Sequence, residues 1–171
     1  MSAGMSWDAE DEADEAASGP MKTFFDERQF LRRQVLDFAF AALFHLLERA
    51  LQRILHQADD VHSEGVLQGK KLRQFDEMCR VLARCGYDTT GLPFARDLDK
   101  LKLISNAVKH GQGVALYRLA KEFPELFLSR EPTETLVFEH LSLTPELFTR
   151  LAASVADFWD SFPTQQPVLE G

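Results

Sequence analysis

The residues best suited to chemistry lie in one stretch near the middle of the chain, Leu101 to Gly113. Asn106 and His110 are four positions apart, so their side chains are neighbours if the stretch is helical. Lys102 and Lys109 fall on the same polar side when each residue advances by about 100° around the helix axis. An imidazole can move protons near neutral pH, and ammonium groups attract phosphate. This stretch is therefore our candidate site for acid–base chemistry or phosphate binding.

The same stretch predicts the end of a helix that runs from about Phe94 to His110. The apolar residues of this helix fall on one side, which we expect to face the core: Phe94, Leu98, Leu101, Ile104 and Val108. Gly111 follows at once, where a helix can end with a residue in the left-handed conformation. Leu103 projects away from the apolar side, so we expect it to be exposed in a monomer, with packing under the Glu131–Leu143 arm of its own chain as the alternative.

Two further groups of residues have weaker patterns. Imidazole and carboxylate groups of the metal-ligand type gather at His56, Asp59, Asp60 and His62, but their spacing matches no closed metal site. We therefore expect no metal and no cofactor. The two cysteines, Cys79 and Cys85, point to different sides of one predicted helix, which favours reduced thiols in a reducing compartment.

The composition is that of a single folded domain with an uneven charge. The chain has 171 residues, of which 45% are hydrophobic and 27% charged, and its formal charge is −8. Most of this charge comes from acids in residues 1–20, so the rest of the chain is nearly neutral, which argues against broad non-specific binding to nucleic acid. The longest apolar run, Phe38 to Leu47, is too short to span a bilayer, and the N-terminus is unlike a signal peptide. We expect a cytoplasmic protein without a membrane anchor.

Three segments divide the chain. Residues 1–20 are predicted to be a disordered acidic tail, because they can bury too little apolar surface to offset the entropy of ordering. Residues 21–163 are predicted to form one helical domain, and residues 164–171 a frayed C-terminal tail.

Periodic apolar residues predict helices over Phe24–His56, Gln68–Cys85, Phe94–His110, Val114–Phe127 with a break at Pro124, and Thr144–Phe162. Thr144, Pro145 and Glu146 are typical of a helix start, with an N-cap, a proline and an acid in the first turn. Glu131–Leu143 alternates like a strand without a partner, which predicts a short extended arm or a small hairpin. The expected fold class is all-α, a four- to five-helix up-and-down bundle with a short extended arm near the C-terminus.

This order of helices, together with the run from Asn106 to Gly111 (NAVKHG), resembles the HEPN superfamily over roughly residues 24–125. The resemblance implies an all-α bundle that is often dimeric and that occurs in RNA-cutting toxins and antiviral defence proteins of prokaryotes. The family's catalytic motif is an arginine followed, after four to six residues, by a histidine, and the residue after the arginine is often polar. Asn106 and His110 match the polar position and the histidine, which makes them the implied catalytic residues.

The arginine of that motif is not matched, because Leu103, Ile104 and Ser105 occupy its allowed places. Lys102 is the nearest cation, and with Lys109 it is our expected RNA-binding or phosphate-binding residue. Lysine is a point charge where arginine offers a bidentate fork, so weak or no nuclease activity is expected. A simpler interpretation of His110 is a helix-terminal histidine that interacts with the last carbonyl groups.

We therefore expect a HEPN-like domain of a prokaryotic defence or toxin–antitoxin type system that is related to RNA. Its enzymatic form would be a metal-free endoribonuclease with a degenerate active site. The alternative is a non-catalytic module for protein–protein interaction or regulation, built on the same bundle. The expected partners are a second copy that brings two Lys102–His110 faces together, RNA, and a protein encoded nearby.

Overall fold

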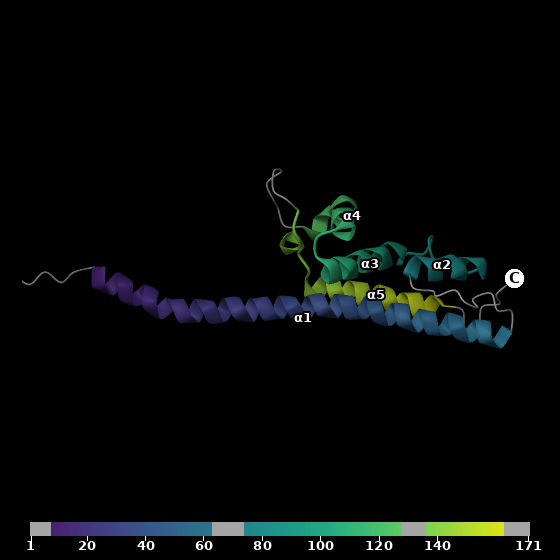
Figure 1. Ribbon diagram of the computed structural model, residues 1–171, viewed down its shortest axis with the longest axis horizontal. Helices are drawn as coiled ribbons and strands as arrows, with labels where there is room; N and C mark the ends of the chain where they lie inside the picture. The colour runs from purple at the N-terminus through teal and green to yellow at the C-terminus, as the bar shows by residue number, and fades with distance from the viewer. Residues whose placement is uncertain (1–7, 63–73, 128–135, 163–171) are drawn as a thin grey trace, which may run out of the picture. The chain divides into compact units, whose positions relative to one another are not determined.

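The computed structural model describes residues 8–62, 74–127 and 136–162, and the side chains of residues 23–57, 74–127 and 136–162 (Figure 1). Its elements are, in chain order, α1 (Asp8–His62), α2 (Phe75–Arg84), α3 (Ala95–His110), α4 (Val114–Glu122), the short 3-10 helices η1 (Pro124–Leu126) and η2 (Phe138–His140), and α5 (Pro145–Ser161). The described residues contain no strand, which confirms the predicted all-α bundle. The chain divides into two compact units, residues 1–35 and residues 36–171.

The first helix begins at Asp8, earlier than the predicted Phe24. It therefore includes most of residues 1–20, the segment that we expected to be disordered. Alanine and glutamate are frequent in this segment, and both have high helix propensity. Residues 1–7 and the predicted frayed tail at 164–171 lie outside the described residues.

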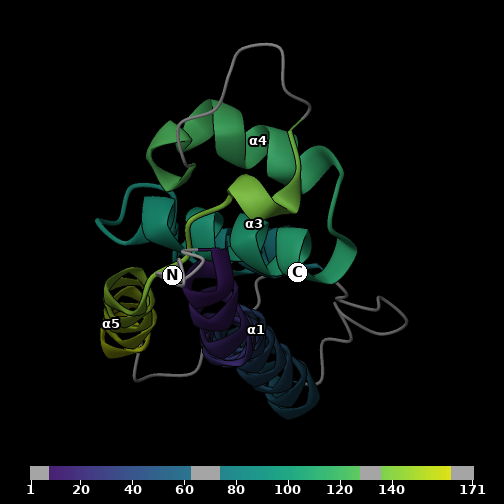
Figure 2. The same cartoon turned by 90° about the vertical axis from the view of Figure 1, so that its left-hand side faces the viewer.

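The helices of the second unit are arranged in layers (Figure 2). α5 lies beside α1, and the rings of Phe40 and Phe148 meet edge to face with 5.4 Å between their centroids. α2 packs on α1 through a similar contact of Phe44 with Phe75, also at 5.4 Å. α3 lies between the α1–α5 pair and α4 (Figures 1 and 2). α3 is therefore the central helix of this unit.

The core is formed by the apolar sides of these helices. Its fully buried residues include Phe40, Leu51 and Leu55 of α1, Leu101 and Ile104 of α3, and Leu151 and Phe158 of α5. The predicted core side of α3 is confirmed, since Phe94 and Leu98 are also buried and Val108 packs against the cluster. Each such side chain contributes roughly 1.5–3 kcal/mol when it is fully buried.

The prediction that Leu103 is exposed is wrong, because its side chain is only 2% exposed. Leu103 lies about 200° around the axis of α3 from Leu101, and α4 packs against α3 (Figure 2). An apolar stripe in the sequence indicates one packed side of a helix. The pattern of α3 did not indicate that a second side of this helix is also packed. The expected homodimer through the Lys102–His110 face therefore loses the exposed leucine on which it was partly based.

The predicted ends of three helices are confirmed. α3 ends at His110, and Gly111 has a positive φ of 64°, a conformation that glycine adopts without strain. α4 ends before Pro124, and α5 begins at Pro145 after the N-cap Thr144. Thr144 Oγ1 accepts a hydrogen bond from the Leu147 backbone N–H at 3.2 Å.

The predicted extended arm is short. Phe127 and Leu141 form an isolated antiparallel bridge, and the Ser142 N–H donates to the Leu126 carbonyl at 2.6 Å. Within the arm, Phe138–His140 forms the 3-10 helix η2, and residues 128–135 lie outside the described residues. Among the helices that the structure describes, none has both the length and the apolar character needed to cross a bilayer.

Replacing Thr144 with alanine removes the side-chain cap of α5 and leaves the Leu147 N–H without this acceptor. We expect Thr144→Ala to lower the free energy of unfolding by about 1 kcal/mol, measured by urea denaturation. Thr149→Ala is the matched control, because Thr149 is exposed and its hydroxyl bonds only to the Pro145 carbonyl of the same helix. If Thr144→Ala and Thr149→Ala lowered the free energy of unfolding equally, the hydrogen bond of the cap would not be a specific source of stability.

Candidate functional site

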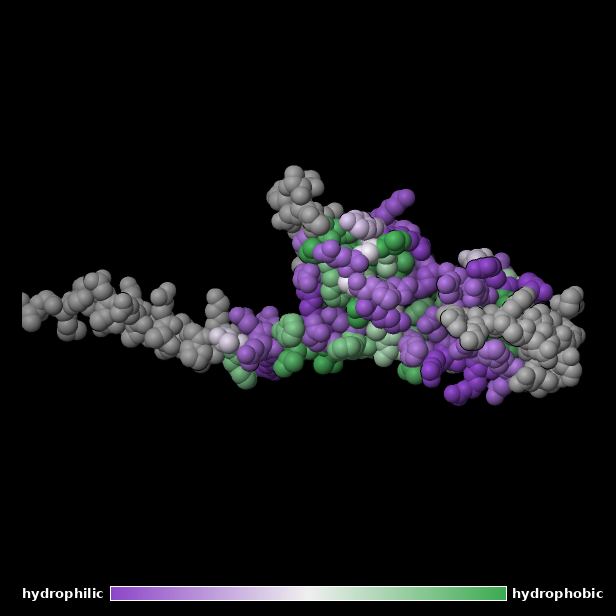
Figure 3. All heavy atoms as spheres, viewed as in Figure 1, coloured by the Kyte–Doolittle hydropathy of each residue, from purple (hydrophilic) through white to green (hydrophobic). Residues whose placement is uncertain are grey.

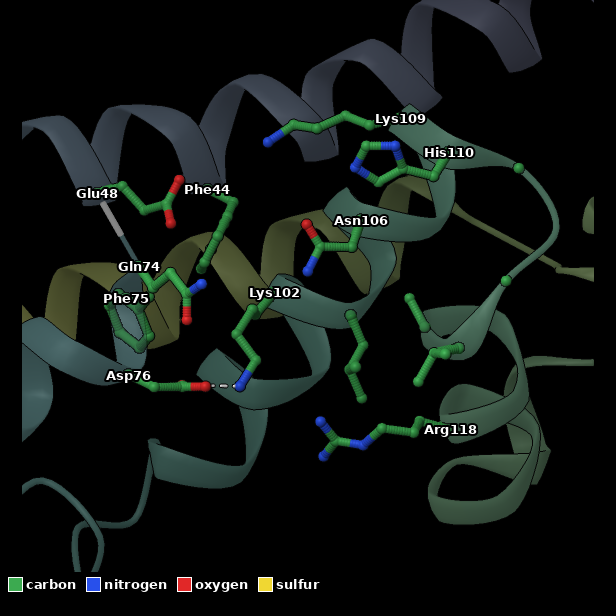
Figure 4. Close-up of a pocket in the computed structure, with 15 residues that line it drawn as sticks. Phe44, Glu48, Gln74, Phe75, Asp76, Lys102, Asn106, Lys109, His110 and Arg118 are labelled. Carbon is green, nitrogen blue, oxygen red and sulfur yellow. Dashed lines mark hydrogen bonds and ion pairs between the residues drawn. The ribbon is translucent and has the colours of Figure 1, made fainter. Parts of the chain in front are cut away.

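A cavity of about 630 Å³ opens on the polar side of α3 (Figure 4). Residues from α1, α2, α3 and α4 line it, so it is formed where these four helices meet. Apolar side chains, among them Phe44, Phe75 and Leu103, form part of its wall. Its polar and charged lining residues are Glu48, Gln74, Asp76, Lys102, Asn106, Lys109, His110 and Arg118.

The structure brings all four predicted site residues into this one cavity. Lys102, Asn106, Lys109 and His110 come from the last turns of α3, and their spacing places them along one side of the helix. Asn106 is half-buried, whereas Lys109 and His110 are exposed. The position of these residues is now established, and their chemical roles stay predictions.

Lys102 is held by two carboxylates. Its Nζ lies 2.9 Å from Asp76 Oδ1 of α2 and 2.7 Å from Asp99 Oδ1, one turn earlier in α3. Its side chain is only 14% exposed. Burial lowers the pKa of Lys102, but the hydrogen bonds and charges of Asp99 and Asp76 outweigh this effect and raise it above the usual 10.5. Lys102 thus links α2 to α3, and little of its charge remains for a phosphate group.

Arg118 is a cavity residue that our sequence analysis missed. It belongs to α4 and lies across the cavity from the end of α3 (Figure 4). Its Nε is 2.9 Å from Glu122 Oε1, and its Nη2 is 3.4 Å from Asp99 Oδ2. The hydrogen bond to Glu122 is the main cause that raises the pKa of Arg118. The motif in the sequence predicts an arginine just before Asn106, whereas the turn at Gly111–Gly113 brings Arg118 of the next helix to the cavity.

Glu48 of α1 adds a half-buried carboxyl group to the cavity. Burial raises its pKa above the usual 4.5, although the positive charges of Lys109 and His45 and the backbone N–H of Phe75 act in the opposite direction. The side chain of Lys109 extends toward Glu48 in Figure 4. Glu48 is therefore a second group, beside His110, that could exchange a proton with a bound ligand.

The charges in the cavity differ in how strongly they are already neutralised. Lys102 and Arg118 each contact two carboxylates. Lys109 and His110 make no such pair among the described residues, so they are the groups most open to an anionic ligand. The arrangement favours binding of a phosphate or carboxylate at the outer end of α3.

No group of side chains among the described residues is arranged to hold a metal ion. Of the cluster noted in the sequence, the side chains of Asp59, Asp60 and His62 lie outside the described ones. Cys79 and Cys85 are both free and half-buried, and burial raises the pKa of both thiols. Neither cysteine lines the cavity.

Comparison of the chain with protein-family models, with curated proteins and with solved structures gave no match. The resemblance to the HEPN superfamily therefore stays a prediction based on the residues of α3.

Replacing Lys102 with methionine keeps most of the length of the side chain and removes both of its ion pairs. We expect Lys102→Met to destabilise the fold by about 1 kcal/mol at pH 7, because its partners are partly exposed and screened by solvent. The pKa of Lys102 is raised in the folded protein, so this contribution is fully present below pH 10.5 and is lost as the pH rises through the folded-state value. Urea denaturation at several pH values measures it.

Lys109→Met is the control on the same helix, because Lys109 is exposed and makes no ion pair among the described residues. It should change the free energy of unfolding by less than about 0.5 kcal/mol. A larger loss than that of Lys102→Met would contradict the structural role of Lys102.

Replacing Glu48 with glutamine removes a carboxylate whose charged form is disfavoured by burial. A folded-state pKa above 4.5 means that stability is lost as the pH rises through that value, so Glu48→Gln should be more stable than the wild type at pH 7, by less than about 1 kcal/mol. The difference should shrink as the pH falls toward 4.5. A variant that is less stable at pH 7 would show that the charge of Lys109 matters more than burial.

Proposed function

We propose that this chain is a HEPN-like domain of a prokaryotic defence or toxin–antitoxin type system that binds single-stranded RNA, with weak or no nuclease activity. The biological setting comes from the resemblance, and RNA binding is supported by the cavity. The single observation that carries most weight is the convergence of Asn106, Lys109 and His110 with Arg118 around one cavity.

The chemistry of the cavity and its rim suits an RNA strand. The ammonium group of Lys109 can neutralise a phosphate, and the amide of Asn106 can bond to a 2′-hydroxyl or a base edge. Tyr117 of α4 is 61% exposed and is the neighbour of Arg118, which lines the cavity. Tyr117 does not line the cavity itself, so it would contact a strand that extends from the cavity over α4, where an exposed ring can stack on an unpaired base.

The same cavity is poorly equipped for cleavage. Metal-free cleavage of RNA needs a base, an acid and a fixed positive charge for the phosphorane. His110 and Glu48 could supply the first two. For the third, carboxylates already compensate Lys102 and Arg118, and the remaining cation, Lys109, is an exposed point charge on a flexible side chain. This compensation supports weak or absent activity rather than efficient catalysis.

The alternative function, a non-catalytic module for protein interaction, is favoured by a different observation. Val114 and Tyr117 of α4 are 77% and 61% exposed and lie one helical turn apart. An exposed apolar pair of this kind also suits contact with a protein, such as one encoded nearby.

Fluorescence anisotropy with a labelled single-stranded RNA of mixed sequence tests the proposal. Lys109→Ala should weaken binding. It should also reduce the slope of log affinity against log salt concentration by about one, the contribution of one phosphate contact. Tyr117→Ala should weaken binding about 5- to 150-fold through loss of one stacked base. Lys121→Ala, which changes an exposed lysine of α4 outside the cavity, is the control and should have a smaller effect.

The same proteins, incubated with RNA and a chelator, test catalysis, with His110→Ala as the comparison. We expect no robust cleavage by the wild type. Robust cleavage that disappears in His110→Ala would show that the compensated cations still act in catalysis. A wild-type protein that fails to bind RNA at tens of micromolar would remove the RNA proposal and leave the protein-interaction alternative.

A further inference from the structure

A row of large apolar side chains lies exposed on α1 within the unit formed by residues 1–35. Phe24, Leu31 and Val35 are 62%, 62% and 68% exposed. Their spacing of seven and four residues places them on one side of the helix. Apolar surface is visible along α1 in Figure 3. We call these three residues the α1 stripe, and no described residue covers it.

The α1 stripe fits a heptad repeat. Phe24 and Leu31 take position d, and Arg28 and Val35 take position a. A β-branched residue at a with leucine at d favours a two-stranded parallel coiled coil, and one polar residue at a fixes the register at some cost in stability. The α1 stripe therefore has the pattern of a surface that pairs with a second helix of the same kind.

The same heptad count can be continued along α1 into the second unit, where it separates exposed from buried residues. Phe38, the next d position, is 68% exposed. Phe40 and Leu47, which take position f, are buried in the core. Positions f and d point to different sides of a helix, so pairing through the d side does not compete with packing of the core.

The charged residues that flank the α1 stripe distinguish the two orientations of a pair. In a parallel pair, position g of one helix meets position e of the following heptad on the other, which brings Glu27 to Arg32 of a second copy. In an antiparallel pair, g meets g and e meets e. The g positions are Glu27 and Gln34, and the e positions are Phe25 and Arg32, so no opposite charges would meet. Charge complementarity thus favours the parallel arrangement.

We propose that residues 24–35 of α1 pair with the same residues of a second copy of this chain as a parallel, in-register, two-stranded coiled coil. Two Glu27–Arg32 ion pairs, one on each side, set the register. This dimer uses neither the cavity nor the Lys102–His110 face, so it is independent of the proposed RNA binding. An isolated helix is marginally stable in water, and pairing supplies the apolar contacts that this part of α1 lacks.

Light scattering coupled to gel filtration on the full chain tests the dimer. We expect the wild type to be dimeric at tens of micromolar and Leu31→Asp to weaken the dimer at least tenfold. Phe30→Asp is the matched control, because Phe30 is 61% exposed like Leu31 but takes position c, outside the α1 stripe. Circular dichroism should show that both variants keep the helical bundle, since neither residue belongs to its core. A monomeric wild type, or equal weakening by the two variants, would overturn the proposal.

A charge exchange tests the orientation. Glu27→Arg and Arg32→Glu each place like charges opposite one another in the parallel dimer, so each variant alone should dimerise more weakly than the wild type. An equal mixture of the two should form heterodimers, because both ion pairs are then restored. Single variants that pair as tightly as the wild type, or a mixture that shows no recovery, would overturn the parallel register.

Discussion

Burial of α3 on two sides is the constraint on which the rest of the second unit depends. Leu101 and Ile104 are fully buried in the core, Leu103 is buried on another side of the helix, and α4 packs against α3. With these directions occupied, the polar side from Lys102 to His110 remains accessible at the end of α3. The cavity lies along this side, and residues of α1, α2 and α4 form its other walls.

The electrostatic character of the cavity follows from how these helices are joined. Lys102 connects α3 to α2 through Asp76, and Arg118 extends from α4 to Asp99 on α3. Each cation therefore helps to hold the walls of the cavity together while its charge is compensated. A site built in this way has defined geometry and modest net potential, which suits selective binding better than stabilisation of a highly charged transition state.

α1 has two kinds of apolar surface, one buried in the core and one exposed. In the second unit it contributes buried phenylalanines and leucines to the core, namely Phe40, Phe44, Leu47, Leu51 and Leu55. Elsewhere along its length the large apolar residues are exposed, which is uncommon for a surface helix without a partner. One helix thus combines a folding surface with a surface suited to association, and the two surfaces occupy different heptad positions.

Much of the fold was determined by local sequence. The apolar period of α3, the glycine after His110 and the cap at Thr144 predicted the extent of the helices, because hydrogen bonding and side-chain periodicity within a helix depend on near neighbours. For the same reason, the shared side of Lys102, Asn106, Lys109 and His110 could be read from spacing alone. The start of α1 was less predictable, because acidic and alanine-rich residues are compatible with either a helix or a disordered tail.

What the tertiary structure decided were the contacts between residues far apart in the chain. Leu103 is buried although it lies outside the apolar side of α3, and the neutralisation of Lys102 depends on Asp76 of α2. The arrival of Arg118 at the cavity depends on the turn between α3 and α4. A periodic pattern shows which side of a helix is apolar, but it does not identify the neighbouring helix or the charge that this neighbour carries. The packing of whole helices decides which helix lies next to which and which charges meet. It thereby determines which charged groups in the cavity remain unpaired and able to bind a ligand.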